Sequence, residues 1–436
     1  MTTKHNDSLL RFMTCGSVDD GKSTLIGRLL FDTKTILADT LTQISNTSKK
    51  RGMEAVDLSL LTDGLQAERE QGITIDVAYR YFSTGTRKYI IADAPGHEQY
   101  TRNMVTAAST ANLAIILIDA RRGVLTQTRR HSYLAHLVGI QHIVVAVNKM
   151  DLMNYDETVY NKICADYLAF AKEIGLARDT IKNTGREIKF IPMSALNGDM
   201  LVDRLDNMPW YTGETLLEML EDAPAADEEQ NAEFRFPVQF VCRPHASSDA
   251  NLHDFRGFMG RIESGNIAIG DAVTVLPNGY TSKVKAIQIG DQQLQAAQTE
   301  QSVTILLEDE IDTSRGDMIV KTDSQASSNK RLEAVKQIEA HVCWLSETPM
   351  STARTYIIRH TTRESKAKVG NIAYKVDVNT LEQQAATELK MNDIARIHFK
   401  LAQPLMVDSY SQNRAIGAFI IIDESTNNTV GAGMIV

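Results

Sequence analysis

The sequence predicts a multidomain protein, with an N-terminal α/β domain built on a doubly wound, mostly parallel sheet and two β-barrel domains after it. Two observations support this fold class. Up to residue 220, strand-like and helix-like segments alternate, and residues 113–118 form a continuous apolar run typical of a strand buried on both faces. After residue 232 the segments are short and β-rich, and turns such as Pro277-Asn278-Gly279 separate them.

The apolar periodicity places the elements of the first domain, residues 1–220, in alternating order. We expect a helix to begin near Lys22 and two more to cover residues 99–109 and 126–138. The expected strands lie at residues 9–13, 76–83, 87–92, 113–118, 142–147 and 189–193. Such an order favours a sheet whose functional loops follow the carboxyl ends of its strands.

An acidic linker, residues 221–232, separates this domain from the β-rich part, since residues 221–230 carry five acidic and no basic side chains. The domain predicted at 233–330 and the domain predicted at 331–436 each read as a small barrel or sandwich. Their expected strands lie at residues 236–243, 258–263, 271–276 and 283–289, then at 340–345, 355–358, 394–401 and 415–422.

Composition indicates a soluble, cytoplasmic protein. The 436 residues suffice for about three domains that each bury a core. No apolar run approaches the length of a membrane span, and residues 1–7 lack an apolar signal region. Four scattered cysteines, without a C-x-x-C pair, favour reduced thiols and make a zinc site improbable. The net charge of −9 shows no strong basic footprint in the total, which leaves local basic patches open; we expect nucleic acid to be an unlikely partner, although acidity alone does not decide this.

Residues 16–23 fit the phosphate-binding pattern G-x-x-x-x-G-K-[ST], directly after a predicted strand. Phosphates need backbone N–H groups that converge at close range, and Gly16 and Gly21 permit that turn. The following helix directs its positive end to the same place. A purely structural glycine turn is the weaker interpretation, because Lys22 and Ser23 follow at the required offset. The predicted nucleotide contacts here are Gly16, Ser17, Val18, Asp19, Asp20, Gly21, Lys22, Ser23 and Thr24.

A second motif, Asn148-Lys149-Met150-Asp151, follows the strand predicted at 142–147 and has the chemistry of a guanine clamp. The Asp151 carboxylate can accept from the N1–H and the exocyclic amine of guanine, a donor pattern that adenine lacks. Lys149 offers an alkyl stem to the ring, and Asn148 can brace the loop. The later turn Ser194-Ala195-Leu196 would present backbone N–H groups to the guanine oxygen. Together with the phosphate loop, these residues predict binding of GTP and GDP.

Several residues are predicted to act at the γ-phosphate. Lys22 is expected to reach the β- and γ-phosphates, and the Ser23 hydroxyl is expected to hold Mg²⁺. Asp93, after the strand predicted at 87–92, is the expected acid beside the metal. Gly96 would place an N–H where the γ-phosphate lies, so that this loop can respond to the presence of that phosphate.

The segment between the phosphate loop and Thr74 is about fifty residues long, far beyond an ordinary connection. We expect it to deliver the Thr74 hydroxyl to the metal and to be released when the γ-phosphate is lost. A surface insertion with its own helices is a compatible alternative. His97, directly after Gly96, is predicted to orient the attacking water, with a structural role as the alternative. The predicted catalytic residues are therefore His97, Lys22 and Thr74, and the predicted metal ligands are Ser23, Thr74 and Asp93.

Residues 16–30, 68–79 and 93–104 resemble the translation-factor-type GTPases of the elongation factor Tu and 1-alpha group, and the likeness covers essentially the whole chain. Within that group the chain is most similar to the GTPase subunits of bacterial sulfate adenylyltransferases. Elongation factors usually carry His at the position of Ser17 and Arg at the position of Gln71, which counts against a ribosomal role here. The resemblance implies that Thr74 is the switch ligand of the metal and that His97 orients water. Asp19 matches a phosphate-loop Asp linked in some relatives to a monovalent cation.

The resemblance also implies a partner, a separate and smaller catalytic subunit that transfers an adenylyl group from ATP to sulfate. GTP hydrolysis on the larger subunit would drive that uphill synthesis of adenosine 5′-phosphosulfate and pyrophosphate. Two alternatives stay open: a translation factor that binds aminoacyl-tRNA or the ribosome, and a GTPase switch with an unrelated protein effector. Some relatives carry a further adenosine 5′-phosphosulfate kinase domain, and the sequence leaves open whether the gene continues beyond Val436.

Overall fold

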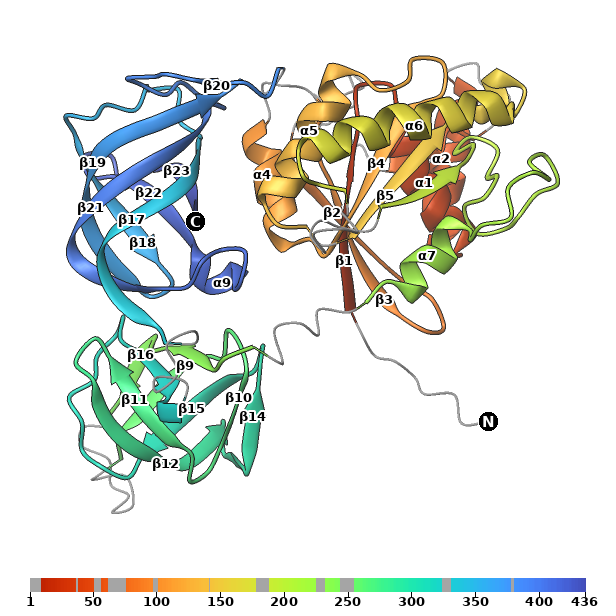
Figure 1. Cartoon of the computed structure of the whole chain (residues 1–436). Helices are drawn as coiled ribbons and strands as arrows, with labels where there is room; N and C mark the ends of the chain where they lie inside the picture. The colour runs from red at the N-terminus through yellow and green to blue at the C-terminus, as the bar shows by residue number, and fades with distance from the viewer. Residues whose placement is uncertain are drawn as a thin grey trace. The chain divides into compact units, whose positions relative to one another are not determined.

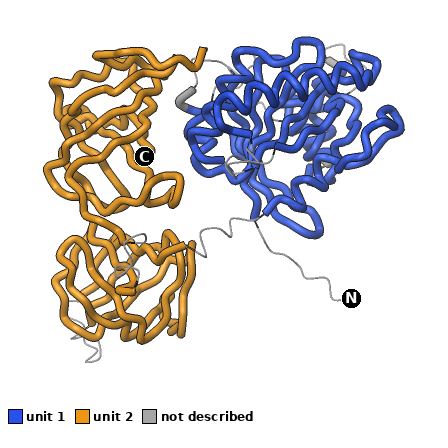
Figure 2. Tube along the Cα trace, viewed as in Figure 1, with its two compact units in different colours: residues 1–226 blue, residues 227–436 orange. Residues whose placement is uncertain are grey.

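The computed structural model of the chain describes residues 9–36, 38–50, 56–61, 76–96, 101–140, 142–177, 188–224, 232–243, 255–323, 331–377 and 380–436. The chain divides into two compact units, residues 1–226 and 227–436 (Figure 2). The first unit is α/β and the second is built mainly of strands (Figure 1), which confirms the predicted fold class. The domain boundaries predicted at residues 220, 232 and 330 stay predictions.

A six-stranded sheet forms the centre of the first unit, in the order β2-β3-β1-β4-β5-β6. Only β2 runs antiparallel to its neighbour, and all other adjacent pairs are parallel. Every residue of β4 is buried, as its unbroken apolar run predicts. The strands are β1 (Leu9–Cys15), β2 (Ala78–Ser83), β3 (Lys88–Asp93), β4 (Leu113–Asp119), β5 (His142–Asn148) and β6 (Ile188–Pro192).

Helices connect these strands, and their ends follow from local side-chain chemistry. The Asp156 side chain accepts from the Thr158 N–H at the start of α6, and Thr215 and Glu218 form a capping box at α7. No helix in the described ranges is long and apolar enough to cross a membrane. The helices are α1 (Lys22–Asp32), α2 (Ala38–Lys50), α4 (Thr101–Thr110), α5 (Thr126–Leu137), α6 (Glu157–Glu173) and α7 (Leu216–Asp222), with the 3₁₀ turns η1 (Leu58–Leu61) and η3 (Met150–Met153).

The second unit contains two β-barrel-like sheets, each with its own apolar core. The first comprises β7 (Arg235–Pro237), β8 (Phe240–Cys242), β9 (Gly257–Arg261), β11 (Ala272–Leu276), β12 (Tyr280–Ile289), β13 (Gln292–Leu294), β15 (Ser302–Leu307) and β16 (Met318–Lys321), beside the pair β10 (Asn266–Ala268) and β14 (Ala296–Gln298). The second comprises β17 (Glu333–Trp344), β18 (Thr355–His360), β19 (Arg363–Val376), β20 (Gln383–Gln384), β21 (Ile394–Val407), β22 (Ala418–Asp423) and β23 (Thr429–Ile435). This second sheet closes on itself because β18 pairs with both β22 and β19.

Two predicted strands of this unit differ from the structure. The strand expected at 236–243 is interrupted at residues 238–239, so that β7 pairs with β16 and β8 pairs with β9. The strand expected at 415–422 begins instead with a helical turn, α9 (Arg414–Gly417). The Asn413 side chain accepts from the Ile416 N–H at 3.1 Å and thereby caps this turn.

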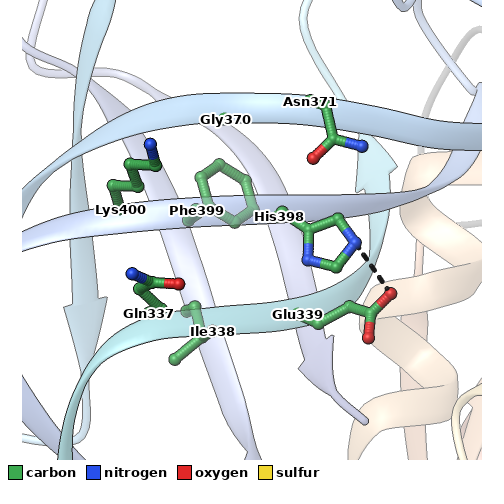
Figure 3. Close-up of a pocket in the computed structure, with 8 residues that line it drawn as sticks. All are labelled: Gln337, Ile338, Glu339, Gly370, Asn371, His398, Phe399 and Lys400. Carbon is green, nitrogen blue, oxygen red and sulfur yellow. Dashed lines mark ion pairs between the residues drawn. The ribbon is translucent and has the colours of Figure 1, made fainter.

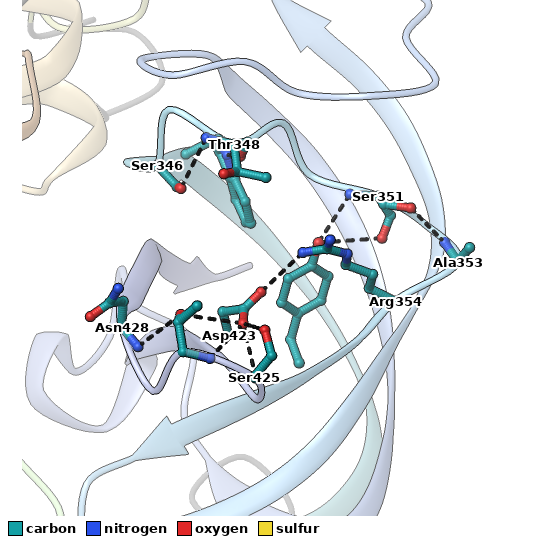
Figure 4. Close-up of polar contacts among 11 residues, drawn as sticks. Ser346, Thr348, Ser351, Ala353, Arg354, Asp423, Ser425 and Asn428 are labelled. Carbon is teal, nitrogen blue, oxygen red and sulfur yellow. Dashed lines mark hydrogen bonds and ion pairs between the residues drawn. The ribbon is translucent and has the colours of Figure 1, made fainter.

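Charged and apolar contacts join the two sheets of the second unit. Arg235, which is 2% exposed, makes a bidentate ion pair with Asp408. A small core shared by both sheets contains Leu276, Met318, Val320, Leu332, Met406 and Ile416. Polar contacts also fix the loops of the second sheet (Figure 4), where Asp423 accepts from the Ser425 and Thr426 N–H groups and pairs with Arg354 at 3.3 Å.

Candidate nucleotide-binding site

Those predicted site residues that the structure describes gather where the parallel strands of the first unit end. The loop 16–21 joins β1 to α1, and Gly21 at the helix start has a φ of 97°, a conformation that favours glycine. Gly96, three residues after β3, also lies close to this loop. A Cβ added at Gly96 would lie 2.8 Å from the Lys22 Nζ and 2.9 Å from the Gly16 carbonyl oxygen. The segment after Asp93 and the phosphate loop therefore approach each other as the sequence predicts for a phosphate cradle.

Lys22 is buried and folds back over the loop. Its ammonium donates to the carbonyl oxygens of Gly16 and Ser17, at 3.0 and 2.9 Å. Burial lowers the pKa of Lys22, although the nearby carboxylates of Asp93 and Asp20 oppose this shift. An ammonium with so little solvent gains from an anionic ligand, so this position suits the phosphates of a nucleotide.

Two carboxylates lie close to Lys22. Asp20 is 1% exposed, and its Oδ2 accepts from the Ser17 N–H. Its Oδ1 is buried and has no hydrogen-bond partner among the described residues. Burial raises the pKa of Asp20, and the charge of Lys22 opposes this rise. Asp93 is also buried and accepts from the Thr14 hydroxyl at 3.1 Å.

The other residues predicted near the phosphates differ in burial, and two of them lie outside the described residues. Ser23 and Thr24 are half-buried in the first turn of α1, Val18 is half-buried, and Asp19 is exposed with a φ of 68°. Thr74 and His97 lie outside the described residues, so their predicted roles at the metal and the water stay predictions.

Asn148 ties the base side of the site to the phosphate side. Its Nδ2 donates to the Asp20 carbonyl at 2.7 Å, and its Oδ1 accepts from the Ala195 N–H at 2.9 Å. This side chain is 2% exposed. Its two bonds connect its own loop to the phosphate loop and to the turn at 194–196, whereas the sequence suggests that it braces a single loop. The contact also occupies the Ala195 N–H, one of the groups predicted to face the guanine oxygen.

The predicted guanine clamp contains a buried acceptor. Asp151 lies in the turn η3, and its Oδ1 is buried without a hydrogen-bond partner among the described residues. A buried acceptor without a donor is costly, and the two donors on the edge of guanine would satisfy it. Leu196 is 67% exposed beside the turn that Asn148 holds, so an apolar side chain is available there.

Two residues of this region were not selected from the sequence. Asp119 ends β4 directly opposite Asn148 in the parallel ladder with β5, and Arg121 follows two residues later. The Arg121 guanidinium donates to both oxygens of the Asp119 carboxylate, at 3.0 and 2.6 Å. The Lys149 ammonium lies 3.1 Å from the same carboxylate. The available signal was a charged residue directly after a buried apolar strand.

A cavity of about 390 Å³ in the second unit is the other candidate site (Figure 3). Its lining comes from β17, β19 and β21 and includes Glu339, His398 and Lys400. Glu339 already makes a bidentate pair with Arg396, at 2.6 and 3.0 Å, and lies 3.1 Å from His398. Because its carboxylate is satisfied within the protein, the cavity has a weaker claim to a ligand than the edge of the parallel sheet.

Comparison with known proteins agrees with the geometry. Residues 7–225 match the family model of the elongation factor Tu GTP binding domain, and residues 337–436 match that of the GTP-eEF1A C-terminal domain-like family. Solved structures of sup35 with GDP and with GMPPNP are 23% and 22% identical, with TM-scores of 0.42 and 0.43, and carry no further weight.

Curated relatives are much more similar. Sulfate adenylyltransferase subunit 1 of Cellvibrio japonicus is 54% identical over 98% of this chain and 86% of its own length. The subunit 1 of Aliarcobacter butzleri is 54% identical over 99% of this chain and 88% of its own length. A bifunctional enzyme CysN/CysC of Rhodopirellula baltica is 52% identical over 98% of this chain and 63% of its own length. The chain thus belongs to the family of sulfate adenylyltransferase subunit 1, with an N-terminal GTP-binding domain of the elongation factor Tu type.

Proposed function

We propose that GTP hydrolysis on this chain drives the synthesis of adenosine 5′-phosphosulfate and pyrophosphate from ATP and sulfate by a separate, smaller catalytic subunit. The single observation that supports the proposal is that Asn148 bonds to Asp20 of the predicted phosphate loop and to Ala195 of the predicted base turn, in a chain that is 54% identical to a sulfate adenylyltransferase subunit 1. The subunit number in the relatives' name supports the existence of a partner.

The residues divide between the two ends of the nucleotide. At the phosphates, the loop at 16–24 supplies backbone N–H groups, and the Lys22 ammonium exchanges its two carbonyl acceptors for phosphate oxygens. At the base, the Asp151 Oδ1, which has no partner among the described residues, accepts from guanine, and the Lys149 stem covers the ring. The turn at 194–196 encloses the remaining edge.

The residues present also fit a magnesium ion. Ser23 lies in the first turn of α1, and the buried Asp93 carboxylate lies near Lys22 at the same loop. Thr74 would complete the ligand set by sequence match. When bound, the ion neutralises charge that develops on the β- and γ-phosphate oxygens. His97 holds the attacking water in line, and Gly96 senses the γ-phosphate through its N–H.

Coupling between the two subunits requires a difference in binding. A partner that bound the GTP and GDP forms equally well would shift neither reaction, however tight the complex. The catalytic subunit must therefore distinguish the two forms of the first unit. The segment that ends at Thr74 is our candidate for this difference, because its contact with the metal is expected to depend on the γ-phosphate.

The decisive experiment measures adenosine 5′-phosphosulfate at equilibrium, with this chain and its catalytic subunit, ATP and sulfate. Hydrolysable GTP should raise the product above the level reached without GTP, because hydrolysis supplies free energy. A nonhydrolysable GTP analogue should raise at most the initial rate. Equal product levels with and without GTP would mean that the GTPase regulates the reaction without driving it. Stimulation of hydrolysis by aminoacyl-tRNA or ribosomes, but not by the adenylyltransferase subunit, would favour a translation factor instead.

A further inference from the structure

The carboxylate of Asp119 is a buried charged group on the base side of the proposed site. Its side chain is fully enclosed, although Arg121, which pairs with it, is 46% exposed and Lys149 is 23% exposed. Burial raises the pKa of Asp119, but hydrogen bonds from Arg121 and Lys149 outweigh it, and the pKa falls to about 2. The group is therefore an anion at neutral pH and needs its two cationic partners.

The contacts of Asp119 form an ordered chain that ends at the phosphate loop. Arg121 donates to both oxygens, Nε to Oδ1 at 3.0 Å and Nη2 to Oδ2 at 2.6 Å, and so fixes the plane of the carboxylate. The Lys149 ammonium lies 3.1 Å from Oδ2 and also donates to the Asp19 carbonyl of the phosphate loop. The Arg121 N–H donates to Oδ1 at 3.0 Å as well.

From these contacts we infer that Asp119 is a positioning residue for guanine nucleotides, which holds the Lys149 side chain between the base and the phosphate loop, with Arg121 as its support. The inference rests on the proposed nucleotide site. It adds to that site a residue that lies outside each of the motifs from which the site was predicted.

Geometry explains why Lys149 needs such a partner. Its backbone is left-handed, with a φ of 64°, and its long side chain has many rotamers. A side chain that must lie flat along a guanine ring binds more weakly if it must first be ordered. The Asp119 carboxylate orders it in advance, since the register of β4 and β5 places Asp119 directly beside Asn148, one residue before Lys149.

The test is a double-mutant cycle on the full-length chain, read as the Kd for fluorescent GDP. Asp119→Asn keeps the shape and removes the charge, and we expect it to weaken GDP about tenfold. Lys149→Met should weaken GDP by at least as much, and the double variant no more than Lys149→Met alone, because Asp119 acts through Lys149. Arg121→Gln should give a smaller loss. A surface control, Glu214→Gln, removes a carboxylate paired with Lys189 at 2.6 Å and should bind GDP normally.

The outcomes separate the inference from the site on which it rests. If Lys149→Met weakens GDP but Asp119→Asn does not, the nucleotide site stands and the role of Asp119 is wrong. If the two losses add fully, Asp119 acts by some route other than Lys149, and the inference is again wrong. If neither Lys149→Met nor Asp151→Asn changes GDP affinity, the proposed nucleotide site itself fails. Thermal unfolding without nucleotide shows whether a variant is folded. If Asp119→Asn is unfolded, the GDP affinities of Arg121→Gln and Lys149→Met test the inference in its place.

Discussion

Gly21 and Asn148 share one small space, and replacing Gly21 with alanine tests how strictly that space is used. The added Cβ would lie 2.5 Å from the Asn148 Nδ2, well below the ordinary contact distance of 3.4–4 Å. Asn148 must therefore move, and its 2.7 Å bond to the Asp20 carbonyl is the contact at risk. The alanine at position 21 must also keep the φ of 97° that Gly21 has, where side chains are rare.

The magnitude is the sum of two costs. A non-glycine residue in the left-handed region costs about 1–2 kcal/mol. A buried carbonyl left without its donor costs about 1–3 kcal/mol. We therefore expect Gly21→Ala to lower the free energy of unfolding of the first unit by about 2–5 kcal/mol. Nucleotide affinity should fall as well, because Asn148 also holds Ala195.

Tryptophan fluorescence in urea measures this cost for the first unit alone. The chain has two tryptophans, Trp210 in the first unit and Trp344 in the second, so a Trp344→Phe background leaves Trp210 as the reporter. Gly85→Ala is the matched control, since no atom of the described residues lies within 4 Å of its added Cβ. Adding Asn148→Ala to Gly21→Ala removes the clash. The double variant should therefore lose less free energy of unfolding than the sum of the losses of the two single variants. An unchanged urea midpoint, or losses that add fully, would refute the reasoning.

Further predictions concern the base, the water and a buried histidine. Asp151→Asn should weaken GTP about ten- to hundredfold and favour xanthosine triphosphate, because a donor replaces the acceptor; competition binding checks this. With the catalytic subunit at saturation, His97→Ala should slow GTP hydrolysis and leave GTP affinity nearly intact, whereas Lys22→Ala should damage binding itself. Burial lowers the pKa of His131 to about 3, so the unfolded chain binds the extra proton between that value and about 6.5. Its contribution to stability is thus complete above about pH 6.5 and is lost as the pH falls toward 3. His131→Gln should therefore reduce the fall in the free energy of unfolding, measured by urea denaturation between about pH 6.5 and 5, by at most about 1.4 kcal/mol per pH unit.

The sequence predicts the first unit well because the evidence there is local. An apolar run such as residues 113–118 has one stable arrangement, a strand covered on both faces, and the structure makes it β4. The second unit shows the opposite case. In β19 the inward positions hold small or polar side chains such as Ser365 and Ala367, so the apolar alternation is weak and no strand was predicted at 363–376. A side-chain cap by Asn413 likewise turned the start of one predicted strand into α9.

The site shows the same division between local and long-range information. Asp93, Asp119 and Asn148 all end buried parallel strands, and each is a polar residue held at the same edge of one sheet. Two of the three were found from the sequence because a motif surrounds them, while Asp119 has no such motif. Its pair with Arg121 is local, but its contact with Lys149 depends on the strand order β1-β4-β5 and on the register that sets it against Asn148. A local pattern specifies neither of these. In a parallel sheet, a charged residue at the end of a fully buried strand therefore belongs among the site candidates before its neighbours are known, because the burial of that charge requires a compensating partner.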